Sequence, residues 1–326
     1  MKQTDFEQLH QSKWQAFAKN VQALREGQRQ PQAIEHFAQD YRGICQHLAL
    51  AKQRGYSYPL IEELQQLALQ GHQQFYRHKS PALQQLIGFV LVGFPATVRA
   101  QWRSVAVAGT LFFGSLTLMA LLTLWFPDLI YSLISANQVA SMESMYDPAN
   151  RIIGPMSARD HQDNWMMFGF YIMNNIGIAF QTFASGLLFG LGSLFFLLFN
   201  GLHIGAVAGH LTRIGYHETF WPFVIGHGAF ELTAIVLAGA AGLKLGSALI
   251  APGRLTRAHA LRHAARISIR LLGGAIIFLL IAAFIEAYWS SSNSLSVTTK
   301  VTVGAALWAL VLLYLGYSGR GRHAPQ

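Results

Sequence analysis

A histidine and a glutamate lie one helical turn apart inside a long apolar segment of the chain. His227 and Glu231 fall within residues 222–246, where Lys244 is the only other ionisable residue. Residues four apart on a helix share a face, so both side chains are expected to point the same way. An ionisable group in hydrocarbon is costly unless a partner receives it, and the pair therefore predicts a buried polar site.

Three kinds of chemistry are open to this pair. A hydrogen-bonded network would fix the packing of neighbouring helices, whereas a series of protonatable groups would conduct a proton, an ion or a solute. Imidazole and carboxylate could also hold a divalent metal with a third ligand from His203, His210 or Glu286. The His-Glu-x-x-His motif of metalloproteases is missing, because no second histidine follows His227 by four residues. We favour the packing network and predict no cofactor, with a divalent metal as the less favoured alternative.

Composition places these residues in a membrane protein. Of the 326 residues, 52% are hydrophobic and 12% charged, and the mean hydropathy is +0.30. The net charge of +9 could indicate nucleic acid binding. The basic residues instead flank apolar runs, where retention in the cytoplasm during insertion explains them. We therefore predict membrane lipids, and no nucleic acid, as partners.

Apolar runs long enough to cross a bilayer, which takes about 20 residues, define the fold class. They lie at about residues 104–126, 166–185, 188–211, 222–246, 270–289 and 300–317. The sequence thus predicts an all-α polytopic membrane protein with about six transmembrane helices. The weak break near Ser185 leaves a broken or re-entrant pair as an alternative for the second and third runs.

Charge predicts the orientation of these spans. Residues 254–270 carry five arginines and two histidines without an acid, whereas residues 127–163 contain Asp128, Glu143, Asp147, Asp160 and Asp163. Six crossings with both termini in the cytoplasm place the basic segment inside and the acidic loop outside. We therefore predict a multi-pass membrane protein with both termini in the cytoplasm.

In this orientation, polar residues of four spans fall between the midplane and the outer surface. The helical period places Asn200 and His203 on one face, together with His210 near the end of their span. The predicted buried polar cluster consists of Asn174, Asn175, Asn200, His203, His227, Glu231 and Glu286.

Residues 1–100 have a different composition from residues 101–326, being rich in glutamine and charge. Their apolar residues recur at helical spacing, which predicts a small cytoplasmic bundle preceding the transmembrane domain. Residues 83–94 are apolar enough to lie among lipid headgroups, with Arg99 and Arg103 as anchors. The two apolar stripes are Trp14, Phe17, Val21 and Leu24, then Ile34, Phe37, Tyr41, Ile44, Leu48 and Ala51. Any stripe left uncovered could join two copies, so a homodimer stays open.

Several classes of protein are excluded by missing motifs. Cys45 is the only cysteine, so neither an intrachain disulfide nor a multi-cysteine metal site can form. The chain has no Walker phosphate loop, no Gly-x-Ser-x-Gly elbow and no aspartate pair in adjacent spans. The first 20 residues are polar, and we expect no cleaved signal peptide.

Motifs in the apolar half resemble the stage II sporulation protein M family over about residues 104–317. The resemblance lies in Asn174-Asn175 through Phe180, Phe189 to Gly192, Asn200-Gly201 through Val207, His227-Gly228 through Glu231, and Ala283 to Glu286. The resemblance implies a multi-pass protein of several helices in the bacterial cytoplasmic (inner) membrane. The namesake works with cell-wall hydrolases during engulfment of the forespore, a role that does not transfer to relatives in bacteria that never sporulate.

The N-terminal domain of about a hundred residues is a departure from the namesake and suggests a cytoplasmic partner. Relatives of this longer type imply a MoxR-like ATPase or a von Willebrand factor A-type protein as that partner. The favoured function is a non-enzymatic component of an envelope-associated membrane assembly. A transporter or channel is the alternative, and an intramembrane metalloenzyme is less favoured.

Overall fold

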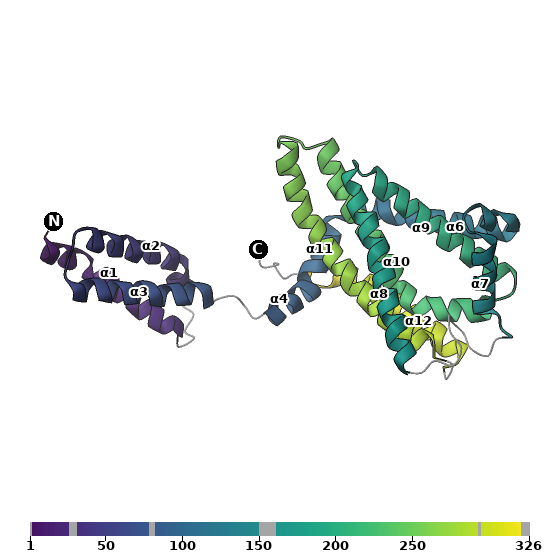
Figure 1. Cartoon of the computed structure of the whole chain (residues 1–326), viewed down its shortest axis with the longest axis horizontal. Coiled ribbons are helices and arrows are strands. Elements are labelled where there is room, and N and C mark those ends of the chain that lie inside the picture. Colours follow the sequence, from purple (N-terminus) through teal and green to yellow (C-terminus); the bar gives the residue numbers. More distant parts are fainter. Residues whose placement is uncertain (1, 26–30, 78–81, 150–160, 293–294, 321–326) are drawn as a thin grey trace. The chain divides into compact units, whose positions relative to one another are not determined.

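The computed structural model describes residues 2–25, 31–77, 82–149, 161–292 and 295–320, and within them the chain is helical without a strand (Figure 1). This confirms the predicted all-α class. The chain divides into two compact units, Met1–Leu86 and Ile87–Gln326.

The first unit consists of three amphipathic helices, α1 (Gln3–Arg25), α2 (Pro31–Gln53) and α3 (Tyr58–Arg77), which lie side by side in Figure 1. Their apolar stripes face one another because each helix has only one side to bury. A side chain at Gly71 would meet the Phe17 ring at 2.7 Å, so this glycine permits α3 to approach α1. The shared core contains Phe6, Trp14, Phe17, Val21, Phe37, Ile44, Ala51, Leu60, Leu64 and Leu67. Of the predicted stripes, the side chain of Ile34 lies outside the described residues.

The second unit begins with a continuous helical segment and continues through seven longer helices and several short turns. In chain order it contains α4 (Ala82–Gly88), η1 (Phe89–Gly93), α5 (Phe94–Ala100), α6 (Trp102–Trp125), η2 (Pro127–Ser132), α7 (Ala136–Tyr146), α8 (His161–Ala184), η3 (Ser185–Leu187), α9 (Leu191–Arg213), α10 (His217–Ile250), α11 (Arg257–Phe284), η4 (Ile285–Ser290) and α12 (Val297–Tyr317). The boundary between the two units falls within α4: its residues 82–86 belong to the first unit, and the segment from Ile87 onward belongs to the second.

Among the described residues, six helices are long and apolar enough to cross a membrane, in agreement with the predicted number. They are Ala82–Ala100, Trp102–Trp125, Leu191–Arg213, His217–Ile250, Arg257–Ser290 and Val297–Tyr317. The set includes the segment expected among lipid headgroups and leaves out α8, which the sequence analysis counted as the second span. Helix α8 has ample length, but its polar first turn and its Asn174-Asn175 pair lower its hydropathy.

Helix α10 is the centre of the membrane unit and packs against α6, α8, α9, α11 and α12. Many of its buried residues are small, among them Ala234, Ala238 and Ala241. Small side chains let helix backbones come close, which is how helices associate where lipid supplies no hydrophobic drive. Figure 1 shows α10 crossing the middle of this unit beside α8 and α11.

Helices α8 and α9 are distinct elements joined by a tight turn. Helix α8 ends at Ala184, the short η3 follows, and Gly190 adopts a left-handed conformation with φ of 83° before α9 begins. Glycine reaches this conformation without the steric penalty of a Cβ. Phe189 also has a positive φ, 53°, which is strained for a bulky residue.

The α4–α5 segment is attached to the last turns of α12. The Tyr314 hydroxyl donates to the carbonyl of Val90, and Arg99 Nη1 donates to the carbonyl of Leu315 at 2.9 Å. Val90 and Arg99, which are nine positions apart on this segment, therefore bond to adjacent residues of α12. The segment crosses one end of α12 instead of running along its length.

Candidate functional site

Three of the predicted site residues meet between α10 and η4. His227 and Glu231 come from α10 and Glu286 from η4, and each offers one ligand atom within 4.8 Å of the other two. His227 Nε2 lies 3.9 Å from Glu231 Oε2. His227 is buried and both carboxylates are half-buried.

The backbone at η4 brings Glu286 to this position. Helix α11 loosens into a π-helical turn from Ile285 to Ser290, and such turns are rare and frequent at functional sites. Opposite this turn, Gly226 precedes His227, and a Cβ there would stand 2.6 Å from the Trp289 ring. Glycine at this position thus allows the indole to pack against α10 next to the histidine.

Ser290 and Lys300 extend the polar group to α12. His227 Nδ1 lies 3.1 Å from Ser290 Oγ, and the buried Lys300 donates from Nζ to the Ser290 carbonyl at 2.7 Å. A buried ammonium group requires acceptors of this kind. Sequence reasoning missed both residues, although a lysine at the start of an apolar span was a signal that a partner must exist.

Tyr146, at the end of α7, is a further residue that sequence reasoning missed. Burial raises the pKa of its phenol, and the nearby Glu286, Tyr171 and Glu231 raise it further. Thr219 Oγ1 donates to the Tyr146 carbonyl, and the Tyr146 ring packs edge-on against Phe220. Helix α7 is therefore fixed to the start of α10, with its terminal phenol close to both carboxylates.

The asparagines and the other histidines have different surroundings. Asn175 is buried on α8 and accepts a hydrogen bond from Asn174 Nδ2 at 2.9 Å. Asn200 Nδ2 donates to the Phe196 carbonyl of its own helix at 2.7 Å. His203 stacks on Phe199, with ring centroids 6.0 Å apart.

His210 is bonded to α7 and not to the three-residue group. Its Nε2 lies 2.6 Å from Glu143 Oε1. Among the described residues, the group able to hold a metal consists of His227, Glu231 and Glu286, so His203 and His210 do not join the other two predicted candidates there. The face of α9 that packs on α6 is formed by Gly201, Gly205 and Gly209.

The arrangement can act chemically in two ways. Its hydrogen bonds connect three helical elements, which fixes their relative positions. Its imidazole and two carboxylates are also a donor set for a divalent cation.

The fold and this cluster define a polytopic α-helical membrane protein with ionisable residues inside its helix bundle. The chain belongs to the stage II sporulation protein M family, whose match covers residues 105–291, more than half of its length. Residues 4–77 match a second family, a domain of unknown function named DUF8413.

One curated relative is similar over a shorter stretch. The uncharacterized protein MJ0793 of Methanocaldococcus jannaschii is 28% identical over 75 residues, which are 23% of this chain and 42% of that protein. The chain thus spans less than half the length of the relative it matches. No solved structure matches the chain.

Proposed function

We propose that this protein is a non-enzymatic membrane component of a bacterial envelope-associated assembly, located in the cytoplasmic membrane. In this role the membrane unit is a rigid anchor, and the N-terminal unit docks a cytoplasmic protein. The observation that carries the proposal is the direct bonding of His227 and Lys300 to Ser290, which ties α10 and α12 to η4.

Direct bonds favour a fixed bundle over a conducting path. The His227 ring bonds to the side chain of Ser290, and Lys300 bonds to the carbonyl of the same residue. The phenyl ring of Phe223 covers the imidazole, with centroids 5.5 Å apart. Hydrogen bonds between membrane helices hold a bundle together where lipid provides no hydrophobic drive.

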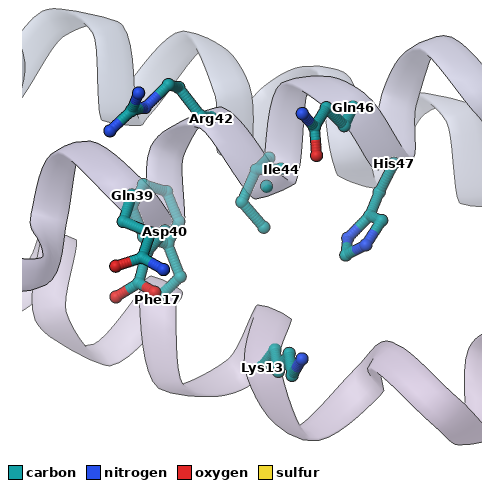
Figure 2. A pocket seen from close by; sticks show the side chains of 9 residues that line it. Lys13, Phe17, Gln39, Asp40, Arg42, Ile44, Gln46 and His47 are labelled. Carbon is teal, nitrogen blue, oxygen red and sulfur yellow. The ribbon is translucent and has the colours of Figure 1, made fainter.

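The N-terminal unit has a groove suited to a protein partner. A cavity of about 510 Å³ between α1 and α2 is lined by Lys13, Phe17, Asp40, Arg42 and His47, among others (Figure 2). Figure 2 shows Lys13 on one helix opposite Gln46 and His47 on the other. Phe17 belongs to the buried core, whereas the cationic and acidic side chains of Lys13, Asp40 and Arg42 offer charge to a protein surface. We propose a MoxR-like ATPase or a von Willebrand factor A-type protein as the partner.

The anchor role is tested by removing its polar bonds. We expect His227→Ala and Glu231→Gln to lower the yield of folded protein in detergent and its melting temperature. Asn200→Ala is the matched control, because Asn200 bonds only within its own helix among the described contacts. Variants that fold normally but abolish proton or solute flux in proteoliposomes would contradict the anchor role and indicate a transporter.

The docking role is tested by crosslinking in native membranes. A photoreactive amino acid replaces Arg42 in the groove, and the same residue replaces the exposed Glu63 on α3 as the control. We expect a crosslink at position 42 to a protein that mass spectrometry identifies as one of the two proposed classes. A crosslink to a second copy of this chain would indicate a homodimer instead, and no crosslink at position 42 would overturn the docking role.

A further inference from the structure

We propose that His227, Glu231 and Glu286 bind one divalent cation of the first transition row, which ties α10 to η4. The inference deepens the structural role of the same cluster and rests on the proposed anchor function. It assigns a ligand to these three residues.

The donor atoms have the chemistry and nearly the spacing of a metal site. One imidazole nitrogen and two carboxylate oxygens lie within 4.8 Å of one another. Ligand atoms of a tetrahedral zinc ion bonded at about 2.1 Å would be about 3.4 Å apart. Small rotations of the two glutamates close that difference. Nitrogen with oxygen donors suits zinc, manganese or ferrous iron, and the absence of thiolate disfavours softer ions.

The imidazole is held in the orientation that a ligand needs. Histidines that bind a metal through one nitrogen almost always have a hydrogen-bond partner on the other. Here Nδ1 faces Ser290 Oγ at 3.1 Å, while Nε2 faces Glu231. With the Nδ1 hydrogen donated to Ser290, the Nε2 lone pair is available to a metal ion on the side of Glu231.

Charge gives a cation a reason to bind. Two ionised carboxylates within the apolar part of the bundle are costly unless a positive charge or a metal ion lies nearby. Lys300 supplies one ammonium group, but its Nζ donates to the Ser290 carbonyl. A divalent cation would bond to both carboxylates directly and stabilise their charged forms within the bundle.

The π-helical turn is a second, independent feature of this site. A regular α-helix would continue from α11 without interruption. Instead, η4 widens the helix over Ile285–Ser290, the stretch that contains both Glu286 and Ser290. The ligand and the residue that orients His227 thus lie on one locally distorted segment. Such distortions persist where function offsets their cost.

The test measures cation binding to the full-length chain in detergent. The protein is purified, stripped with a chelator, and titrated with Zn²⁺ or Mn²⁺, while Co²⁺ absorption reports the ligand field. We expect one ion per chain, a loss of binding in Glu286→Gln, and a 10- to 100-fold weaker affinity in Ser290→Ala, as for other residues that orient a ligand. Asp128→Asn is the matched control, since it removes an exposed carboxylate that is far from Glu286 in the sequence.

The wild-type chain alone decides the matter if the variants do not fold. We expect its melting temperature to rise when Zn²⁺ is restored and to fall with chelator, because a ligand of the folded state stabilises it. No ion at one equivalent, or equal binding by Glu286→Gln, overturns the metal site even if His227→Ala destabilises the metal-free protein as the anchor role requires. Binding without any effect of His227→Ala on the metal-free protein would overturn the anchor role alone.

Discussion

Gly186 and Gly242 lie backbone against backbone, so that a Cβ on Gly186 would overlap the carbonyl of Gly242. The contact repeats one turn away, where a Cβ on Gly246 would overlap the amide nitrogen of Gly190. Both contacts press α10 onto the turn between α8 and α9. The four glycines therefore set how closely α10 approaches this turn.

We predict that Gly246→Ala destabilises the membrane unit by about 3 kcal/mol or more, at the upper end for overpacked sites, because the atoms in its way are backbone and cannot rotate aside. The measurement is the melting temperature of the full chain in detergent. Gly114→Ala is the control, since nothing lies within 4 Å of a Cβ there and alanine favours a helix. Equal melting of both variants would refute the close approach as a determinant of the fold.

The elements of this fold follow from local pattern, which the sequence shows directly. Long apolar runs define the membrane helices, and the four-residue spacing of His227 and Glu231 puts both on one face. The sequence also shows Gly186 and Gly190, and Gly242 and Gly246, as pairs of small residues four positions apart, a spacing typical of close helix contacts. Which pair would meet which was not visible, because that depends on how helices far apart in sequence pack.

The rest of the site depends on tertiary placement. Ser290 reaches His227 across 63 residues through a π-helical turn that periodicity does not predict. Tyr146 reaches the carboxylates because α7 folds back onto the start of α10. The helical period of α9 predicts which residues share a face with His203, but not which face of α9 packs on another helix. The glycines of α9 decide which face packs on α6.

A pH dependence is predicted for the N-terminal unit. The rings of His10 and His47 stack with centroids 4.0 Å apart, and Trp14 Nε1 donates to His47 Nδ1 at 3.0 Å. Burial and then Lys13 lower the pKa of His10, while burial, then His10 and Lys13, lower the pKa of His47. The two histidines of the unfolded chain therefore bind protons at a pH near their ordinary pKa of 6.5, whereas those of the folded unit bind protons only at a lower pH.

It follows that this unit is most stable above pH 6.5 and loses stability as the pH falls through 6.5 toward the lower folded-state values. Reaction of Cys45 with a thiol reagent in increasing urea reports unfolding, with glutathione correcting for the intrinsic effect of pH. We expect a lower urea midpoint at about pH 5.5 than at about pH 7.5. The double variant His10→Gln with His47→Gln should lose most of this difference, and a midpoint that rises on acidification would disprove the assignment.

The side of the membrane on which each loop lies can be predicted from the α4–α5 segment. Because Val90 and Arg99 both bond to the last turns of α12, this segment stays at one end of the bundle. Helix α8 packs along α10 and α11 and is expected to cross. Cys45 and Arg320, which follows α12, should then face the cytoplasm, with Asn137 of α7 on the opposite side.

Labelling with a membrane-impermeant maleimide distinguishes this topology from two others, in which Ala82–Ala100 crosses the membrane either without α8 or together with it. Cys45 is the native probe, and Asn137→Cys and Arg320→Cys are compared in a Cys45→Ser background. We expect Asn137→Cys to react in intact cells, and the other two positions to react only after the membrane is opened. If Ala82–Ala100 crosses and α8 does not, all three positions share the cytoplasmic side; if both cross, Cys45 and Arg320 separate. Either pattern would refute the topology on which the depth of the His227 cluster depends.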